Sequence, residues 1–222
     1  MRRRFDVLNR LATIEPGHAV GEVGCGNGVV QQQLEEHHGI AVDGIDLNEY
    51  ALRQNQTERG RLLCYNVFDR NESLRETYDS VILFDVIEHL DDDAGFLDAV
   101  LHLVKPGGRV FINVPAFMHL FSHYDVAQGH FRRYDWEMLR TLAASRELIE
   151  DRWTYWGMPL IPLLYLRKLM LSVRRRPDVI EQGFAVHSKT LNSMLTHWSR
   201  AEWIPQHVYG TSLMASFIKP TG

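Results

Sequence analysis

Short apolar runs alternate with amphipathic stretches along residues 19–114, and this alternation strongly limits the folds open to the chain. Five runs have the length and composition of buried strands, at residues 19–23, 41–46, 62–65, 80–84 and 109–114. Between them, residues 29–37 and 95–104 carry apolar side chains at helical spacing. Strands that alternate with helices usually form a parallel sheet covered on both faces, so the pattern predicts a Rossmann-like, doubly wound α/β fold.

The segments outside this pattern extend the predicted fold. Phe5, Leu8, Leu11 and Ile14 recur at helical spacing and predict an amphipathic N-terminal helix. Two later apolar runs, at residues 148–155 and 212–219, would bring a mostly parallel sheet to seven strands. Residues 136–145 between them are typical of a helix.

The composition excludes some classes of protein. A net charge of −4 and a pI near 6.2 argue against binding to nucleic acid through bulk charge. The basic start of the chain lacks the apolar core of a signal peptide. The sequence has no uninterrupted stretch of about 20 apolar residues, which is the length needed to span a bilayer. Cys25 and Cys64 have neither metal nor redox spacing, so we expect reduced thiols in a cytoplasmic protein.

A glycine-rich loop follows the first predicted strand in the stretch "AVGEVGCGNGVV". Gly24, Gly26 and Gly28 lie between a strand and a helix, where a ligand can approach the backbone closely. Their G-x-G-x-G spacing differs from the dinucleotide fingerprint G-x-G-x-x-G. Glu22 stands just before them, and a carboxylate there does not suit a phosphate. The loop therefore argues against a nicotinamide oxidoreductase.

A second acid, Asp46, ends the next predicted strand, 22 residues after Gly24. A carboxylate at this point can accept hydrogen bonds from ribose hydroxyls. Glu22 and Asp46 together suit a ligand that has a ribose and a positively charged end but no pyrophosphate, and S-adenosyl-L-methionine fits this description. The alternative is that both acids are solvated strand ends and that the glycines only turn the chain.

Four motifs strengthen the first interpretation: "GEVGCGNG", "VDGIDLN", "YDSVILFDVIEHLDDD" and "LVKPGGRVFINVPA". In this order and spacing they resemble the motifs of class I S-adenosylmethionine-dependent methyltransferases across almost all of residues 19–116. The later stretches "SHYDVAQGHFRRYDWEMLRTL" and "GTSLMASFIK" are similar to a subgroup that often methylates small molecules, glycans or lipids. The resemblance implies S-adenosyl-L-methionine as cofactor and a small-molecule acceptor.

The resemblance also implies which residues bind the cofactor. Glu22, Gly24, Cys25 and Gly26 would line its methionine part. Seven further residues would complete the site: Asp46 and Leu47 at the ribose, Asn66 and Val67 at the adenine, and Phe84, Asp85 and Val86 after the fourth strand. The family often has Asp where this chain has Asn66, which leaves the detail of adenine recognition open.

On this basis we expect a single domain over residues 1–222. Its predicted parts are an N-terminal helix at 1–18, a cofactor-binding core at 19–116, an active-site loop at 117–134 and a helical cap insertion at 156–200.

Methyl transfer to a hydroxyl or amine requires alignment of donor and acceptor and removal of a proton. His89 follows the fourth strand and His130 lies in the loop, and both are candidate bases because histidine titrates near neutral pH. The alternative for His89 is a structural hydrogen bond at a helix start. The acids at residues 88 and 91–93 are interpreted as the charged first turn of the following helix, with no chemistry.

The loop also supplies candidate acceptor-binding residues, together with one aromatic residue near the cap: His119, His123, Asp125, Arg132, Arg133, Tyr134 and Trp156. The two arginines are suited to clamp a carboxylate or phosphate, or else to brace the loop by pairing with Asp125 or Asp135. The histidines form no compact ligand motif, so we predict no metal.

The apolar segment 156–176 ends in three arginines. It is suited to peripheral contact with a membrane or a lipid-like acceptor. The more common alternative is packed core or a dimer face, and either a monomer or a homodimer is compatible with it. The predicted function is methyl transfer from S-adenosyl-L-methionine to a small molecule, such as a sugar or a lipid-linked one. The alternative is a non-catalytic nucleoside-binding or regulatory protein on the same fold.

Overall fold

The computed structural model describes residues 2–11, 14–173 and 202–221. Seven strands are present in this part of the chain: β1 (Val20–Val23), β2 (Val42–Asp46), β3 (Leu62–Cys64), β4 (Tyr78–Phe84), β5 (Val104–Pro115), β6 (Ile149–Trp156) and β7 (Ser212–Ile218). The helices are α1 (Arg2–Leu11), α2 (Val29–His38), α3 (Glu49–Arg53), α4 (Asp93–Leu101), α5 (His123–Ala127), α6 (Trp136–Ala144) and α7 (Ile161–Val173).

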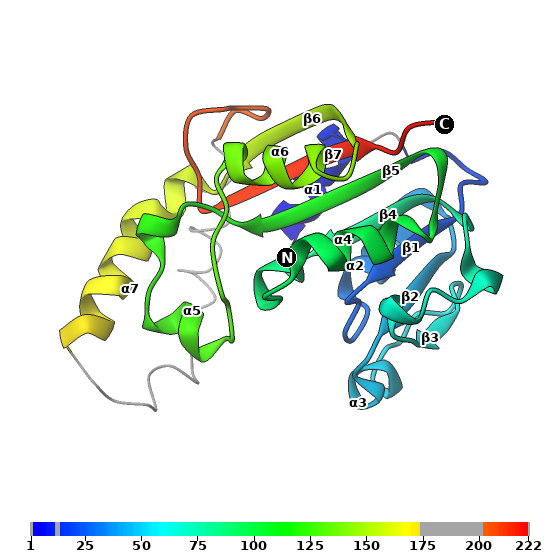
Figure 1. Cartoon of the computed structure of the whole chain (residues 1–222). Helices are drawn as coiled ribbons and strands as arrows, with labels where there is room; N and C mark the ends of the chain where they lie inside the picture. The colour runs from blue at the N-terminus through cyan, green and yellow to red at the C-terminus, as the bar shows by residue number, and fades with distance from the viewer. Residues whose placement is uncertain (1, 12–13, 174–201, 222) are drawn as a thin grey trace.

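The strands form one sheet in the order β3-β2-β1-β4-β5-β7-β6 (Figure 1). Neighbours from β3 to β5 are parallel, whereas β7 runs antiparallel to β5 and β6. The order reverses direction between β1 and β4, which is the point where open α/β sheets bind ligands at the carboxyl ends of their strands. The predicted mostly parallel, seven-stranded doubly wound sheet is confirmed.

Alternate residues of the central strands face two separate cores. Val81 and Leu83 pack with α4 and α6 on one face, whereas Ile82 and Phe84 pack with α1 and α2 on the other. Figure 1 shows the same division, with α4 and α6 in front of the sheet and α1 behind it. Because β4 is apolar on both faces, it can lie only at the centre of the sheet, and its carboxyl end is thereby fixed beside β1.

Several boundaries differ from the sequence prediction. The helix expected at 95–104 is α4, which begins two residues earlier and ends at Leu101, while Val104 already pairs with β4. The "KPGG" stretch, expected as a turn, lies within β5 at a register shift between β4 and β5. The expected loop at 117–134 contains the short helix α5, and a 3₁₀ turn at Met118–Leu120.

The predicted cap is only partly described. Of residues 156–200, the structure describes a 3₁₀ turn at Met158–Leu160 and α7, and residues 174–200 lie outside the described part of the chain. In Figure 1, α7 extends away from the sheet alongside α5. Tyr165, Leu166 and Leu169 on α7 are about half exposed. Contact with lipid or with a second copy through this segment stays a prediction.

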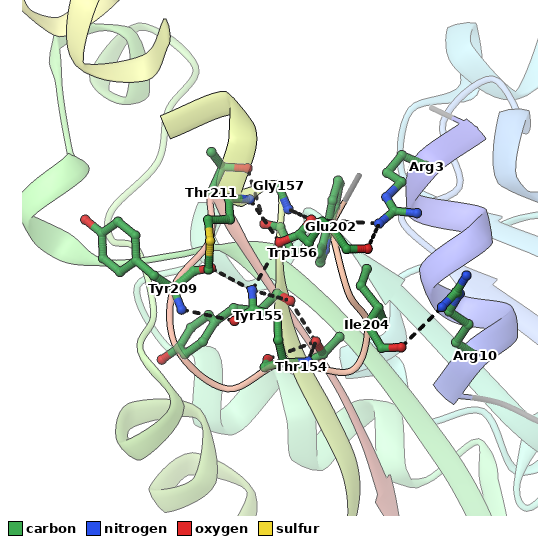
Figure 2. Close-up of polar contacts among 12 residues, drawn as sticks. Arg3, Arg10, Thr154, Tyr155, Trp156, Gly157, Glu202, Ile204, Tyr209 and Thr211 are labelled. Carbon is green, nitrogen blue, oxygen red and sulfur yellow. Dashed lines mark hydrogen bonds and ion pairs between the residues drawn. The ribbon is translucent and has the colours of Figure 1, made fainter. Parts of the chain in front are cut away.

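The segment that leads into β7 holds α1 against the sheet, and Figure 2 shows its contacts. Arg10 of α1 donates a hydrogen bond to the Ile204 carbonyl at 3.2 Å, and Arg3 donates to the Glu202 carbonyl at 3.3 Å. The Glu202 carboxylate accepts from the Gly157 amide at 2.7 Å. These bonds join α1, the end of β6 and the segment before β7, and so fix α1 near the carboxyl ends of the strands. None of the helices in the described residues is long and apolar enough to cross a membrane.

Candidate functional site

The glycine loop joins β1 to α2 at the carboxyl edge of the sheet. Gly24, Gly26 and Gly28 all have positive φ angles, of 78°, 53° and 77°, which side chains other than glycine rarely adopt. A Cβ atom on Gly24 would lie 2.4 Å from Val86 Cγ2, so the loop packs directly on the residue that follows β4 by two positions. Because the three glycines have no side chains, the backbone of the loop stays accessible to a ligand.

Asp46 joins this loop to the end of β2. Its Oδ2 accepts a hydrogen bond from the Gly26 amide at 2.8 Å, and its Oδ1 accepts from the Asn48 amide at 2.8 Å. A carboxylate oxygen has two lone-pair positions, so each oxygen retains one acceptor position after these bonds. Leu47 beside it is 68% exposed and offers an uncovered apolar side chain.

Glu22 lies inside the sheet below the loop and is 3% exposed. Its Oε2 is buried without a hydrogen-bond partner. Burial raises the pKa of Glu22 to about 8, although the nearby Arg4 lowers it in part. One oxygen of the Glu22 carboxyl group is therefore unsatisfied, and a cation would stabilise the group in its charged form. Burial and Glu22 together raise the pKa of Cys25 to about 12, so its thiol stays protonated.

A chain of polar contacts crosses the ends of β4, β5 and β6. The Trp156 indole donates to Asn113 Oδ1 at 2.8 Å, and Asn113 Nδ2 donates to Asp85 Oδ1 at 2.8 Å. The other Asp85 oxygen pairs with Arg4 of α1. Asp85 has a positive φ of 55°, a conformation that is strained for most side chains but tolerated by aspartate. Trp156 was predicted to bind the acceptor, but in the structure it holds Asn113, which in turn donates to Asp85.

The remaining predicted cofactor residues surround the loop in two groups. Phe84 is 6% exposed and packs in the core under Arg4, whose guanidinium carbon lies 5.6 Å from its ring centre. Val67 is also buried, and Asn66 caps its short helix by accepting from the Phe68 amide at 3.1 Å. The structure therefore brings the predicted cofactor residues to one edge of the sheet, at the ends of β1, β2, β3 and β4.

A cavity of about 450 Å³ lies beside this edge. Its lining includes Asp85, Glu88, His89, His130 and Arg133, together with side chains of α1, α5 and α7. The two predicted bases meet here, because the His89 and His130 rings are 4.6 Å apart and nearly perpendicular. Partial burial and the neighbouring His130 lower the pKa of His89. His89 is therefore neutral at pH 7 and able to accept a proton.

Glu88 corrects one interpretation of the sequence. It does not lie in the first turn of α4, which begins at Asp93 with Asp92 as its N-cap. Instead Glu88 is fully buried in a 3₁₀ turn, and neither carboxyl oxygen has a hydrogen-bond partner. Burial raises its pKa to about 8, so it is mostly protonated at neutral pH. Within the described residues, Glu88, His89 and His130 each place one ligand atom within 4.8 Å of the others and could hold a metal ion.

Asp125 organises the loop from its interior. It is fully buried, pairs with Arg133 at 2.6 Å and contacts His130 Nδ1 at 3.3 Å. Burial alone would raise the pKa of Asp125, but the His130 contact and the Arg133 charge lower it to about 2. The Asp125 carboxylate is thus ionised at neutral pH, and with its negative charge it orients His130 toward the cavity.

The other predicted acceptor residues mostly brace the loop. Arg132 pairs with Asp93 at 3.0 Å and Asp91 at 3.6 Å, and the buried Tyr134 donates to Asp93 at 2.7 Å. Of the predicted residues in this loop, Asp125, His130 and Arg133 line the cavity. His123 is exposed at the start of α5, and His119 is exposed and contacts Tyr209.

Among the charged residues that line the cavity, three were not predicted from the sequence: Arg4, Glu88 as a buried acid without a partner, and Arg167 of α7. Arg4 and Arg167 lie far from the motifs along the chain and reach the site only through the packing of α1 and α7. The stretch "DVIEHL" contained a signal for Glu88, because an acid directly follows an apolar residue there. The favourable effect of acids in the first turn of a helix offered another explanation for the same residue, and the sequence did not distinguish the two.

The sheet order and the acid-edged glycine loop define a Rossmann-like α/β fold of the methyltransferase class. Comparison with known proteins supports a family: residues 22–110 match the family model described as a methyltransferase domain, and this match points to the class I S-adenosylmethionine-dependent methyltransferases.

Curated relatives match up to about half of the chain. A ubiquinone biosynthesis O-methyltransferase from Aeromonas salmonicida is 35% identical over 103 residues, which is 44% of this chain and 43% of the relative. One from Xylella fastidiosa is 30% identical over 115 residues, covering 50% and 46%. The chain thus matches these relatives over less than half of their length.

Solved structures share the whole fold. Phosphoethanolamine N-methyltransferase 2 from Haemonchus contortus, in complex with S-adenosyl-L-methionine, superimposes with a TM-score of 0.64 at 18% identity. The match covers 99% of this chain and 52% of that protein. The cyclase SpnF has a TM-score of 0.65 at 13% identity, covering 99% and 82%. Because a cyclase and a methyltransferase share the fold, the reaction must be argued from the site.

Proposed function

We propose that this protein transfers the methyl group of S-adenosyl-L-methionine to a hydroxyl or amine of a small-molecule acceptor, such as a sugar or a lipid-linked compound. The observation that carries the proposal is the pair of acids at the glycine loop. Asp46 holds free acceptor positions at the end of β2, and Glu22 is an unsatisfied buried carboxyl below Gly24. A ribose diol and a cationic methionine end satisfy the two together, whereas a pyrophosphate brings no positive charge to stabilise the Glu22 carboxylate.

The residues present fit this cofactor. Asp46 would accept from the ribose hydroxyls, Leu47 would cover the ribose, and Asn66 and Val67 would flank the adenine. At the other end, Glu22 would face the positive charge. Arg4, whose buried Nε has no hydrogen-bond partner, would serve as the cation for the methionine carboxylate. When bound, S-adenosyl-L-methionine supplies an activated methyl group on sulfur, so the protein has only to align the acceptor and accept a proton.

The cavity beside Asp85 is suited to hold the acceptor. His89 is neutral at pH 7, and His130 is oriented by the ionised Asp125. One of these imidazoles would take the proton from the acceptor hydroxyl or amine as the new bond to carbon forms. The proton then leaves to solvent, since His89 is exposed. Trp156 and Asn113 would hold Asp85 in place at the boundary between cofactor and acceptor.

The alternative is a non-catalytic protein that binds the nucleoside without transferring the methyl group. The likeness in fold to a cyclase keeps this alternative relevant. The cluster of His89, His130 and Asp125 favours catalysis, because a protein that only binds a nucleoside has no need of a histidine pair beside the ligand.

The test combines binding with turnover. Calorimetry should show micromolar binding of S-adenosyl-L-methionine and S-adenosylhomocysteine, and weak or no binding of NAD. Asp46→Ala removes two acceptors of ribose hydrogen bonds, each worth about 1.5–3 kcal/mol when a charged group is involved, so the affinity should fall at least 100-fold, to order of magnitude. Asp98→Asn is the control, since Asp98 only pairs with Arg70 on the surface. Tight NAD binding, or an unchanged affinity in Asp46→Ala, would overturn the proposed cofactor.

Turnover can be measured with cofactor labelled in the methyl group and a metabolite extract. His89→Gln and His130→Gln should bind S-adenosylhomocysteine as the wild type does, while at least one of them should lose roughly 100-fold in rate. Full rates in both variants would contradict the acceptor site. Cofactor binding without any labelled product from any extract would favour the non-catalytic alternative.

A further inference from the structure

The charges that line the 450 Å³ cavity do not balance. Three arginines reach it, and two of them already have carboxylate partners: Arg4 pairs with Asp85, and Arg133 pairs with Asp125 at 2.6 Å. Arg167 of α7 is the third. Among the described residues it has no ion pair and no hydrogen bond from its guanidinium, and its Nε is buried without a partner. Among the described side chains that line the cavity, one arginine therefore has no acid partner.

Arg167 is held in place by an aromatic ring rather than by an acid. Its guanidinium carbon lies 4.0 Å from the centre of the Tyr124 ring, on helix α5. Stacking of this kind fixes the plane of the guanidinium and leaves its N–H groups free to donate. An arginine fixed by stacking has already lost much of its side-chain freedom, so less entropy is lost when a ligand binds.

The remaining acid in the cavity does not neutralise Arg167. Glu88 is fully buried, neither of its carboxyl oxygens has a hydrogen-bond partner, and among the described residues it forms no ion pair with Arg167. An unpartnered carboxyl group suits a hydroxyl or amine at the reacting end of an acceptor. The cavity thus offers a polar end at Glu88, His89 and His130, and a cationic end at Arg167.

We propose that the acceptor carries a carboxylate or a phosphate, and that the Arg167 guanidinium binds this oxyanion while the group to be methylated lies at Glu88, His89 and His130. The guanidinium fork matches the geometry of both oxyanions. This inference rests on the proposed function, because it concerns the acceptor of the same reaction. It assigns the anion to α7 and not to the loop arginines Arg132 and Arg133, both of which have acid partners.

The experiment uses the full chain saturated with S-adenosylhomocysteine and adds inorganic phosphate or acetate at constant ionic strength. The Arg167 Nε–H signal in a ¹H–¹⁵N NMR spectrum, identified by its loss in Arg167→Lys, should shift on titration, because this donor has no partner in the free cavity. Arg167→Gln should weaken binding of the anion at least tenfold. Arg140→Gln is the matched control, since Arg140 pairs with Glu137 on the surface of α6.

The outcomes separate this inference from the proposed function. If S-adenosylhomocysteine does not bind, the proposed function fails; if it binds but neither anion moves the Arg167 signal, only the present inference is overturned. Equal anion affinity in Arg167→Gln and wild type would also overturn it, provided that circular dichroism shows both to be folded. Arg167→Lys keeps the charge without the fork and should bind with intermediate affinity.

A further arm identifies the source of the anion. Phosphatidylcholine vesicles with and without phosphatidic acid can be compared with inorganic phosphate in wild type and Arg167→Gln. Stronger binding to the anionic vesicles that depends on Arg167 supports a lipid-linked acceptor. Preference for free phosphate or acetate supports a soluble one. Binding to vesicles that is equal in Arg167→Gln and wild type contradicts a lipid oxyanion at this position.

Discussion

At the scale of single residues, surroundings rather than residue type decide which side chains are available for chemistry. Arg133 and Arg167 both line the cavity, but Asp125 satisfies the first and no described acid satisfies the second. Likewise His89 and His130 lie 4.6 Å apart, yet only His130 contacts Asp125. Asp125 therefore has two tasks: it neutralises a buried arginine and it orients a histidine.

Because Asp125 neutralises the buried Arg133, we expect Asp125→Asn to lose much of the protein's stability. The change leaves the Arg133 charge, 4% exposed, without its counter-ion, and breaking a buried pair in this way costs about 3–5 kcal/mol of the free energy of unfolding. Chemical denaturation measures it. The control is Asp98→Asn, whose pair with Arg70 is about half exposed and should change stability by less than about 1 kcal/mol. A loss below about 1 kcal/mol in Asp125→Asn would mean that this pair is not buried in solution.

At the scale of elements, the glycine loop depends on the contact between the ends of β1 and β4. These strands are neighbours although β2 and β3 lie between them in the sequence. Gly24 therefore packs on Val86, and its φ of 78° opens the backbone at the same point. The loop is formed jointly by local backbone preference and by the adjacency of β1 and β4.

Gly24→Ala separates the two contributions. The new Cβ would lie 2.4 Å from Val86 Cγ2 and would also strain the positive φ, so we expect at least a tenfold loss of affinity for S-adenosylhomocysteine, measured by calorimetry. The double variant Gly24→Ala with Val86→Ala should recover part of the loss, because it removes the clash but not the strain. Gly107→Ala is the control, with a similar φ of 75° in β5 and only Thr221 Cγ2 nearby, at 3.4 Å. If Gly24→Ala binds normally, the loop does not contact the cofactor.

At the scale of the whole molecule, two buried acids make stability depend on pH. Burial raises the pKa of both Glu22 and Glu88 to about 8, whereas an unfolded glutamate titrates near 4.5. Between these values the folded protein holds protons that the unfolded chain releases, so the free energy of unfolding falls as pH rises. Burial of these two carboxyl groups thus lowers the free energy of unfolding at neutral pH.

Urea denaturation at pH 6.5 and pH 8 tests this expectation. Wild type should lose roughly 1 kcal/mol per pH unit for each of the two groups. The aspartates titrate below this window, whereas His38 and His89, whose pKa values are lowered from 6.5, oppose the slope slightly at its lower end, because the unfolded imidazoles are still partly protonated there. The variant Glu22→Gln with Glu88→Gln should show a nearly flat profile. A wild-type profile that is already flat, or an equally steep one in the double variant, would contradict the assignment of these pKa values.

Much of the fold followed from local pattern. Apolar runs such as residues 80–84 predict buried strands because such strands are apolar on both faces, and the alternation with helices then predicts the parallel sheet. The boundary errors at α4 and β5 arose because Pro and Gly in "KPGG" normally signal a turn, whereas here pairing with β4 and β7 overrides that preference. The glycine loop and the acids Glu22 and Asp46 could also be predicted from the sequence, because these residues lie close together along the chain.

The sequence by itself determined the class of fold, the glycine loop and the acids beside it, since each depends on residues close together in the chain. Only the tertiary structure decided which charges remain unpaired. Arg4, Glu88, Arg133 and Arg167 come from four separate segments, and packing alone sets which of them has a partner. Because the free energy of a buried charge depends on its neighbours in space, the charge distribution of the cavity is set only when α1, α5 and α7 lie against the ends of the strands.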